Sequence, residues 1–205
     1  MNTNLKRLQK RIAEQSDYSR RKAEELIIEG KVSVNGETIQ ELGYKVTDKD
    51  KIEIEGVALN TNEKKYFILN KPEKCVSTVS DDKGRKTVID FIKTKAKVYP
   101  IGRLDYDTTG ILLLTNDGEL AQNLTHPSKG VEKTYEVRIK GRVRDEDLQV
   151  IANGVKLEDG MTAPATIVDL GFDDHNGVHE VEISMKVVID KFAVCLNTLG
   201  TAFII

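Results

Sequence analysis

Apolar and polar residues follow two different periods in the first third of the chain. Over residues 4–16 and again over 19–29, apolar residues recur every three or four positions, which predicts two amphipathic helices. Strict alternation over 31–39, around an Asn-Gly pair, predicts a tight hairpin, and a second alternating run at 51–56 predicts another strand. We expect these elements to form a small domain over residues 1–60, followed by a short polar linker.

Short strands dominate the rest of the chain. Apolar runs and alternating patterns predict strands at 66–72, 110–114, 134–139, 165–170 and 178–185, and helices at 87–94, 120–124 and 145–154. The strands outnumber the helices and often follow one another directly. This order favours an α+β fold with a mostly antiparallel mixed sheet over residues 64–184, and it argues against a doubly wound parallel sheet.

Composition narrows the class of protein and its compartment. With 39% hydrophobic and 31% charged residues, the chain is too apolar for a disordered tail. No apolar run approaches the roughly 18 residues of a membrane helix, and the polar, basic start lacks the apolar stretch of a signal peptide. The two cysteines, Cys75 and Cys195, stand apart in the sequence, which argues against a disulfide framework or a structural zinc site. We therefore expect a cytoplasmic protein, monomeric and without a membrane partner.

The net charge of −2 hides two basic stretches. Residues 1–31 hold 8 lysines and arginines against 5 acidic residues, and residues 64–103 hold 11 against 4, whereas residues 32–60 are acidic. Such cations can be ordinary solvated surface. They can also form a nucleic-acid contact surface, because phosphate neutralisation needs clustered lysine and arginine. Charge alone leaves both interpretations open.

One polar segment, GRLDYDTTGILLLTNDG at 102–118, places carboxylates directly before a predicted buried strand. Rigid backbone could hold Asp105 there so that it faces a cleft, or Asp105 or Asp107 could merely cap a turn. A glycosidase pair is disfavoured, because those enzymes hold two carboxyl groups about 5–9.5 Å apart on opposite sides of a sugar. The residues themselves leave the capping and the catalytic interpretation open.

The same segment closely resembles the signature of the RNA pseudouridine synthases that act on ribosomal RNA. The resemblance extends through YFILNKP, VEKTYEV and VHEVEI, and LQKRIAEQSDYSRRKAEELIIEGKVSVNG resembles the S-four-type RNA-binding domain that precedes the catalytic domain in that family. The two together span about residues 4–184. The resemblance implies an enzyme that detaches uracil from its ribose, rotates it and rejoins it through carbon 5, with no cofactor and no metal.

The resemblance also implies roles for individual residues. Asp105 matches the family's catalytic nucleophile or base, and Tyr135 matches the tyrosine that packs on the target base. Arg103, Thr108 and Gly110 complete the first motif and are expected to shape the active-site loop. Asp105 could attack the anomeric carbon of the ribose, attack the ring, or remove a ribose proton, and the sequence does not choose among these.

A basic cluster at the start of the second predicted helix is the candidate RNA-binding site of the first domain. Arg20, Arg21 and Lys22 could be no more than a solvated helix start. RNA backbone contact is favoured, because the free N–H groups of a helix N-terminus attract phosphate as well.

Two weaker candidates concern histidine and cysteine. His175 and His179 lie four residues apart, a spacing that suits a metal on a helix, but the Asn-Gly pair between them predicts a turn. Metal binding is therefore disfavoured. Cys75 has no histidine nearby in the sequence and is expected to be a packing residue.

The end of the chain departs from the family. The family's last motif, similar to EGRNRQVRRMFEAIGH, supplies an arginine that pairs with the catalytic aspartate, and it is missing after Ser184. Codons can be chosen for Lys186–Ile205 such that the frame starting at the third base of the Lys186 codon encodes GRNRQVCRMFEYIGHSVYH. Loss of one base would convert ISYEGRNRQ into ISMKVVIDK. We therefore expect residues 185–205 to be a frameshifted tail on a truncated, impaired chain.

The sequence thus predicts a pseudouridine synthase whose partner is ribosomal RNA. The LQK start and the overall spacing favour large-subunit over small-subunit RNA. The alternative is a non-catalytic protein that binds ribosomal RNA through the same two basic surfaces.

Overall fold

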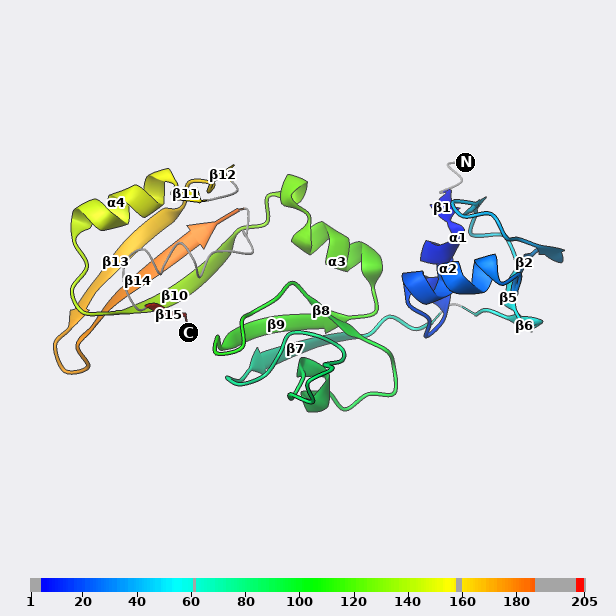
Figure 1. The fold of residues 1–205 in the computed structure, drawn as a ribbon, viewed down its shortest axis with the longest axis horizontal. Coiled ribbons are helices and arrows are strands. Elements are labelled where there is room, and N and C mark those ends of the chain that lie inside the picture. Colours follow the sequence, from blue (N-terminus) through cyan, green and yellow to red (C-terminus); the bar gives the residue numbers. More distant parts are fainter. Residues whose placement is uncertain (1–4, 61, 158–159, 187–201, 205) are drawn as a thin grey trace. The chain divides into compact units, whose positions relative to one another are not determined.

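The chain divides into two compact units (Figure 1), and the computed structural model describes residues 5–60, 62–157, 160–186 and 202–204. The first unit holds the chain up to Tyr66 together with Thr94–Val98 and Asn116–Gly118, and the second unit holds the rest. In the described ranges, no helix has both the length and the apolar character needed to cross a membrane.

Two short helices pack against small antiparallel strands in the first unit. The elements are β1 (Lys6–Arg7), α1 (Leu8–Gln15), α2 (Arg20–Ile28), β2 (Val32–Val34), β3 (Glu37–Thr38), β4 (Lys45–Val46), β5 (Ile52–Ile54) and β6 (Val57–Ala58). The larger sheet has the order β3-β2-β5-β6 and is antiparallel throughout. Its core gathers one face of each helix and alternate strand residues, among them Leu8, Ile12, Ile27, Val32 and Ile54.

The two helices begin differently from one another. The helix predicted over 4–16 begins only at Leu8, because the two residues before it are extended and pair with β4. The second helix begins after Ser19, as predicted, and the Ser19 hydroxyl accepts a hydrogen bond from the backbone N–H of Lys22 at 3.1 Å. It is followed by Gly30, whose φ of 70° suits a helix end.

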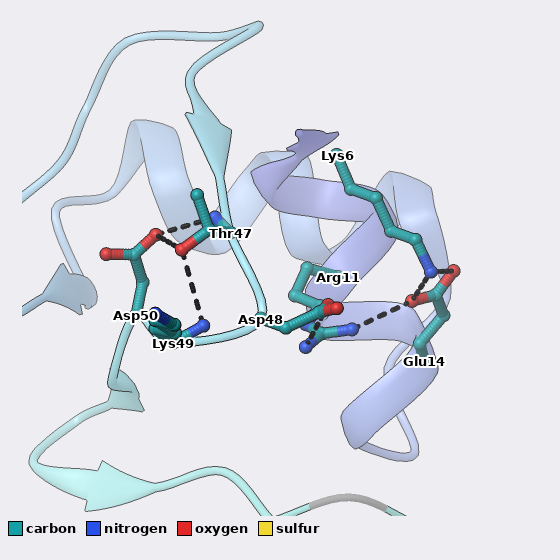
Figure 2. Close-up of polar contacts among 7 residues, drawn as sticks. All are labelled: Lys6, Arg11, Glu14, Thr47, Asp48, Lys49 and Asp50. Atoms are coloured by element: carbon teal, nitrogen blue, oxygen red, sulfur yellow. Dashed lines mark hydrogen bonds and ion pairs between the residues drawn. The ribbon is translucent and has the colours of Figure 1, made fainter. Parts of the chain in front are cut away.

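Acidic side chains neutralise part of the positive charge of β1 and α1. The Lys6 ammonium lies 3.0 Å from Glu14, and the Arg11 guanidinium lies 2.7 Å from Asp48 and 3.6 Å from Glu14 (Figure 2). These two cations therefore form ion pairs within the unit, although both belong to the basic stretch over residues 1–31.

Asp50 stabilises the turn that precedes β5 through hydrogen bonds. Its carboxylate accepts hydrogen bonds from the Thr47 backbone N–H at 2.6 Å, from the Thr47 hydroxyl at 2.8 Å and from the Asn35 side chain at 2.8 Å (Figure 2 shows the two bonds to Thr47). These bonds favour the ionised form and hold the pKa of Asp50 below its usual value, the backbone bond from Thr47 having the largest effect. They join this turn to the hairpin loop of β2 and β3.

The second unit contains two larger sheets, one two-stranded sheet and several short helices (Figure 1). Its elements are β7 (Tyr66–Lys71), η1 (Val88–Phe91), β8 (Tyr99–Ile101), β9 (Gly110–Thr115), α3 (Gly118–Thr125), η2 (Pro127–Lys129), β10 (Lys133–Lys140), α4 (Asp145–Asn153), β11 (Lys156–Leu157), β12 (Gly160–Met161), β13 (Thr166–Asp173), β14 (Val178–Met185) and β15 (Ala202–Ile204). Strand orders are β7-β9-β8 and β13-β14-β10-β15, and β11 pairs with β12. The α4 helix packs Leu148 and Ile151 into the core that Val137, Ile139 and Val181 form.

The predicted α+β class is confirmed, with antiparallel pairing between β8 and β9, β10 and β14, and β13 and β14. The helix predicted over 87–94 is only one 3-10 turn: Thr87 and Asp90 form a capping box at its start, and the chain is already extended again at Ile92. Of the tail predicted from Met185 onward, residues 187–201 and 205 lie outside the described residues. Met185 itself is buried at the end of β14.

Candidate active site

Asp105 lies in the loop that joins two neighbouring antiparallel strands, β8 and β9. We refer to residues 102–109 as the Asp105 loop. Its turn is closed by the Thr108 backbone N–H, which donates to the Asp105 carbonyl at 3.2 Å. The side chains of Asp105, Tyr106 and Asp107 are all exposed. Within the described residues, the Asp105 carboxylate has no hydrogen-bond or ion-pair partner, so it is open to a ligand.

A fully buried lysine, Lys71, donates hydrogen bonds to the backbone of this loop. Its ammonium donates to the carbonyl oxygens of Asp105 at 2.8 Å, Thr108 at 2.8 Å, Pro72 at 3.0 Å and Tyr106 at 3.3 Å. Burial lowers the pKa of Lys71, and the negative groups nearby, Asp105 among them, oppose that shift. The Lys71 ammonium thus contacts the backbone of the candidate catalytic residue.

Two further contacts fix the loop. The Ser77 hydroxyl donates to the Leu104 carbonyl at 2.7 Å and accepts from the Leu104 backbone N–H at 3.1 Å. The Cys75 backbone N–H donates to the Tyr106 carbonyl at 3.4 Å. Lys71 at the end of β7 and the segment after it therefore hold residues 104–108 of the loop, except the exposed Asp107.

Gly110 follows the loop as the first residue of β9, with a backbone conformation that other residues avoid. Its φ is 129°, and a side chain there would meet only Leu104, at an ordinary contact distance of 3.9 Å. We therefore expect Gly110→Ala to lower the free energy of unfolding by about 1–3 kcal/mol through backbone strain, not through a clash. Urea unfolding measures this. Gly118→Ala, at the start of α3, is the control and should cost nothing. Equal effects of the two changes would contradict the strain argument.

Tyr135 lies in β10, opposite Ile183 of β14, and its ring is half-buried against the sheet core. Burial raises the pKa of its phenol, and the Asp105 carboxylate raises it further. The structure therefore brings the Tyr135 side chain within electrostatic reach of Asp105. Thr108 is buried in the loop, whereas Arg103 is exposed at its start.

A tethered arginine lies beside the loop. Arg85 forms two side-chain hydrogen bonds with Asp81, at 2.7 and 3.2 Å, and its guanidinium stands 5.9 Å from the centre of the Tyr106 ring. The bonds from Arg85 hold the pKa of Asp81 down to about 2. Sequence reasoning assigned no role to this group.

The candidate RNA-binding residues of the first unit all lie exposed at the start of α2. Lys22 pairs with Glu25 at 2.8 Å, which raises the Lys22 pKa. Arg20 and Arg21 have no ion pair or side-chain hydrogen bond to any part of the chain that the structure describes. The two arginines are therefore the more available cations.

The two histidines and the cysteine that the sequence offered as weaker candidates lie in different surroundings. His179 is buried in β14, accepts the Val143 backbone N–H at one ring nitrogen and lies 2.7 Å from Asp169 at the other. His175 is exposed in the turn after β13. Among the described residues, no three histidine, cysteine or acidic side chains are grouped so as to hold a metal ion. Cys75 is fully buried, as expected for a packing residue.

Lys71 is the main residue that sequence reasoning missed. A signal existed, because Lys71 alternates in phase with Phe67 and Leu69, the inward-facing residues of β7. A lysine on the buried face of a strand needs hydrogen-bond partners, so its position in the pattern indicates a polar contact in the interior.

Comparisons with known proteins identify the family of the chain. The model of the RNA pseudouridylate synthase family matches residues 65–187, and that of the S4 domain matches residues 6–52. The chain belongs to the RNA pseudouridine synthase family, which consists of isomerases, and it carries an N-terminal S4 domain. The family predicted from the sequence is thereby confirmed.

Individual relatives support this assignment. Ribosomal large subunit pseudouridine synthase B of Bacillus subtilis (strain 168) is 49% identical over 182 residues, which cover 88% of this chain and 75% of the relative. An uncharacterized RNA pseudouridine synthase of Aquifex aeolicus is 40% identical over 178 residues, covering 85% and 72%. A crystal structure of a pseudouridylate synthase aligns with a TM-score of 0.63 at 31% identity, covering 97% of this chain and 85% of that one.

Proposed function

We propose that this chain isomerises uridines of large-subunit ribosomal RNA to pseudouridine in the cytoplasm, with Asp105 as nucleophile or base. Residues 1–60 would bind the RNA and residues 64–184 would carry out the reaction. The observation that carries the proposal is the Asp105 carboxylate, exposed and unpaired among the described residues, on a loop that Lys71 and Ser77 hold in place. The large-subunit substrate is inferred from the name of the Bacillus subtilis relative.

The geometry suits a base that is brought to the loop from outside. A uridine must leave its stack to reach Asp105, which costs a few kcal/mol. Stacking on an aromatic face returns about 1–3 kcal/mol per base, and Tyr135 offers such a face near Asp105. Isomerisation breaks the bond from ribose to nitrogen and forms one to carbon 5 without redox change or hydrolysis. The carboxylate and the RNA therefore suffice as reactants.

The tail from Met185 onward bears on how much activity to expect. We infer from the sequence that these residues are read one base out of frame, because the neighbouring frame can encode GRNRQVCRMFEYIGHSVYH, which resembles the family's last motif. That motif would supply the arginine partner of Asp105. We call the product with one base reinstated before the Lys186 codon the frame-restored chain.

Tritium release from RNA labelled at carbon 5 of uridine tests the proposed function. An isomerase must replace the hydrogen at that carbon, so the frame-restored chain should release tritium from large-subunit RNA. A protein that only binds RNA releases none. Binding without release by the frame-restored chain would establish the non-catalytic alternative.

Removing Arg20 and Arg21 should flatten the salt dependence of RNA binding. Each lost phosphate contact lowers the slope of log affinity against log salt by about 0.7–0.9, so the double alanine variant should lose roughly 1–2 in slope. Lys31→Ala is the matched control, because Lys31 already pairs with Glu29 at 2.8 Å. An unchanged slope in the double variant would remove these arginines from the interface.

Deletion of residues 1–60 extends the same test to the whole first domain. The Glu63 carbonyl accepts from Asn116 at 2.9 Å and the Lys65 backbone N–H donates to Asn116 at 2.8 Å, so the deletion must keep residues from 62 onward. We expect weaker RNA binding and a flatter salt slope, with the remaining chain still folded. Binding that matches the undeleted chain at every salt concentration would contradict an RNA-binding role for this domain.

A further inference from the structure

Two lysines of the second basic stretch, Lys95 and Lys97, have no role in the active site described above. Their segment, Thr94–Val98, belongs to the first unit, although the residues on either side of it belong to the second. Val98 is buried, whereas both lysines are exposed. The segment therefore carries two cations onto the surface of the unit that holds the S4 domain.

A hydrogen bond places this segment beside the residues that lead into α2. The Lys97 ammonium donates to the Asp17 carbonyl at 2.7 Å, although the two residues are 80 positions apart. Arg20 follows Asp17 by three residues, so their Cα atoms lie at most about 11 Å apart. The Cα atoms of Lys95 and Lys97 lie at most about 8 Å apart for the same reason. The two basic stretches of the sequence therefore meet in one region of the first unit.

Cations outnumber acids where the two stretches meet, over residues 17–22 and 94–98. The cations are Arg20, Arg21, Lys22, Lys95 and Lys97, and the acid is Asp17. Lys22 pairs with Glu25 at 2.8 Å. The side chains of Arg20, Arg21 and Lys95 have no ion pair or hydrogen bond to any residue that the structure describes. Such positive charge suits a polyanion, because its contacts with phosphates release bound counterions.

An aromatic side chain lies among these cations and narrows the class of partner. Tyr18 is 39% exposed and stands between Asp17 and Ser19, the cap of α2. Bases of a single-stranded nucleic acid stack on such a ring while neighbouring cations follow the backbone. An acidic protein segment would use the charges but not the ring. The combination favours single-stranded RNA.

We propose that residues 17–22 and 94–98 form one surface for a single-stranded stretch of ribosomal RNA, in which Lys95 and Lys97 extend the phosphate contacts of Arg20 and Arg21 and Tyr18 stacks an unpaired base. We call it the joint basic surface. It rests on the RNA-binding part of the proposed function. It adds a segment that lies outside the S4 match over residues 6–52.

The salt dependence of binding to protein-free large-subunit ribosomal RNA tests the role of Lys95. In the chain as it stands, Lys95→Ala should lower the slope of log affinity against log salt by about 0.7–0.9. At physiological salt this corresponds to binding that is about four- to fivefold weaker. The Lys95 side chain has no contact to lose among the described residues, so the variant should fold. An unchanged slope would overturn the proposal.

Lys45→Ala is the matched control. Lys45 of β4 is also exposed and unpaired among the described residues. It follows Tyr44, whose carbonyl accepts from the first N–H of α1, whereas Asp17 comes after the end of that helix. Eight helical residues span about 12 Å, so Lys45 lies at the other end of α1. Its replacement should leave the slope unchanged, and a loss equal to that of Lys95→Ala would overturn the proposal.

Asp17→Asn should change the affinity in the opposite direction. The Asp17 carboxylate is exposed among the cations and repels a phosphate that approaches them. Its removal should tighten RNA binding about twofold at low salt. Glu41→Gln, which removes an exposed acid before β4, is the control and should change nothing. Unchanged affinity in Asp17→Asn would place the RNA elsewhere and refute the joint basic surface.

Lysine acetylation of the unaltered chain, read by mass spectrometry, locates the RNA without any substitution. Bound RNA should protect Lys95 and Lys97 and leave Lys45 reactive. Equal reactivity of Lys95 with and without RNA would refute the proposal. Polyglutamate at the same concentration of charge should displace little RNA, and complete displacement would assign the surface to an acidic protein instead.

These results separate the joint basic surface from the proposed function. If the double variant at Arg20 and Arg21 loses slope and Lys95→Ala does not, RNA binding by the first domain stands and the joint basic surface is refuted. If Lys95→Ala behaves as expected but the frame-restored chain releases no tritium, the proposed isomerase activity is refuted and the joint basic surface stands.

Discussion

Asp105→Asn is expected to abolish uridine isomerisation while RNA binding stays nearly intact. The amide keeps the shape of the carboxylate but can act neither as a nucleophile nor as a base. The exposed Asp105 side chain has no partner among the described residues, so the substitution breaks no contact that holds the loop. We expect turnover of the frame-restored chain, measured by tritium release, to fall at least ~10⁴-fold.

Asp107→Asn is the matched control for this prediction. Asp107 is exposed in the same loop, and its substitution removes the same charge two residues away. It should leave turnover largely unchanged and, like Asp105→Asn, should not alter the urea unfolding midpoint. Comparable losses from the two substitutions would show that the charge of the loop matters and not the position of one carboxylate. Substantial turnover in Asp105→Asn would remove that residue from the reaction.

Periodic patterns predicted the long elements because several residues repeat the same signal. The second helix and β14 follow this rule, and the Ser19 cap could be named in advance. Strands β8, β11 and β12 have only two or three residues each, too few to establish an alternation. The early start predicted for α1 failed for a tertiary reason, because pairing with β4 takes Lys6 and Arg7 out of the helix.

The residues that hold the backbone of the candidate site could not be predicted from periodic patterns. Asp105 was predicted as a site residue from its motif, whereas the contacts of Lys71 reach carbonyls 34 to 37 residues away along the chain. Backbone carbonyls have no residue identity, so no sequence pattern reveals them as partners. Ser77 poses the same difficulty, because it bonds only the backbone of Leu104.

Counting charges along the chain also overstated the basic surface of the first unit. Lys6, Arg11 and Lys22 each have an acidic partner within 3.0 Å. An ion pair between exposed groups contributes little to stability, but it lowers the charge offered to a phosphate. The RNA-binding prediction therefore rests more on Arg20 and Arg21 than on the total of lysines and arginines.

Reinstating one base before the Lys186 codon is expected to convert an inactive or nearly inactive chain into an active one. When RNA covers the Asp105 loop, the carboxylate loses water, and without a cation its charged form is penalised. Leaving one member of a desolvated ion pair alone costs about 3–5 kcal/mol. The motif GRNRQVCRMFEYIGHSVYH would bring the arginine that the family pairs with this aspartate. Tritium release should therefore appear once the frame is restored.

An insertion of three bases at the same place is the control for this last prediction, because it lengthens the DNA but keeps the present frame and the present tail. That product should stay inactive while still binding RNA through the first unit. The arginine supplied by the restored frame can then be tested directly: its replacement by methionine should return the frame-restored chain to the inactive level, since the same uncompensated carboxylate results. A chain with its present tail that released tritium as fast as the frame-restored one would show that Asp105 works without this arginine, and the inferred frameshift would have no consequence for catalysis.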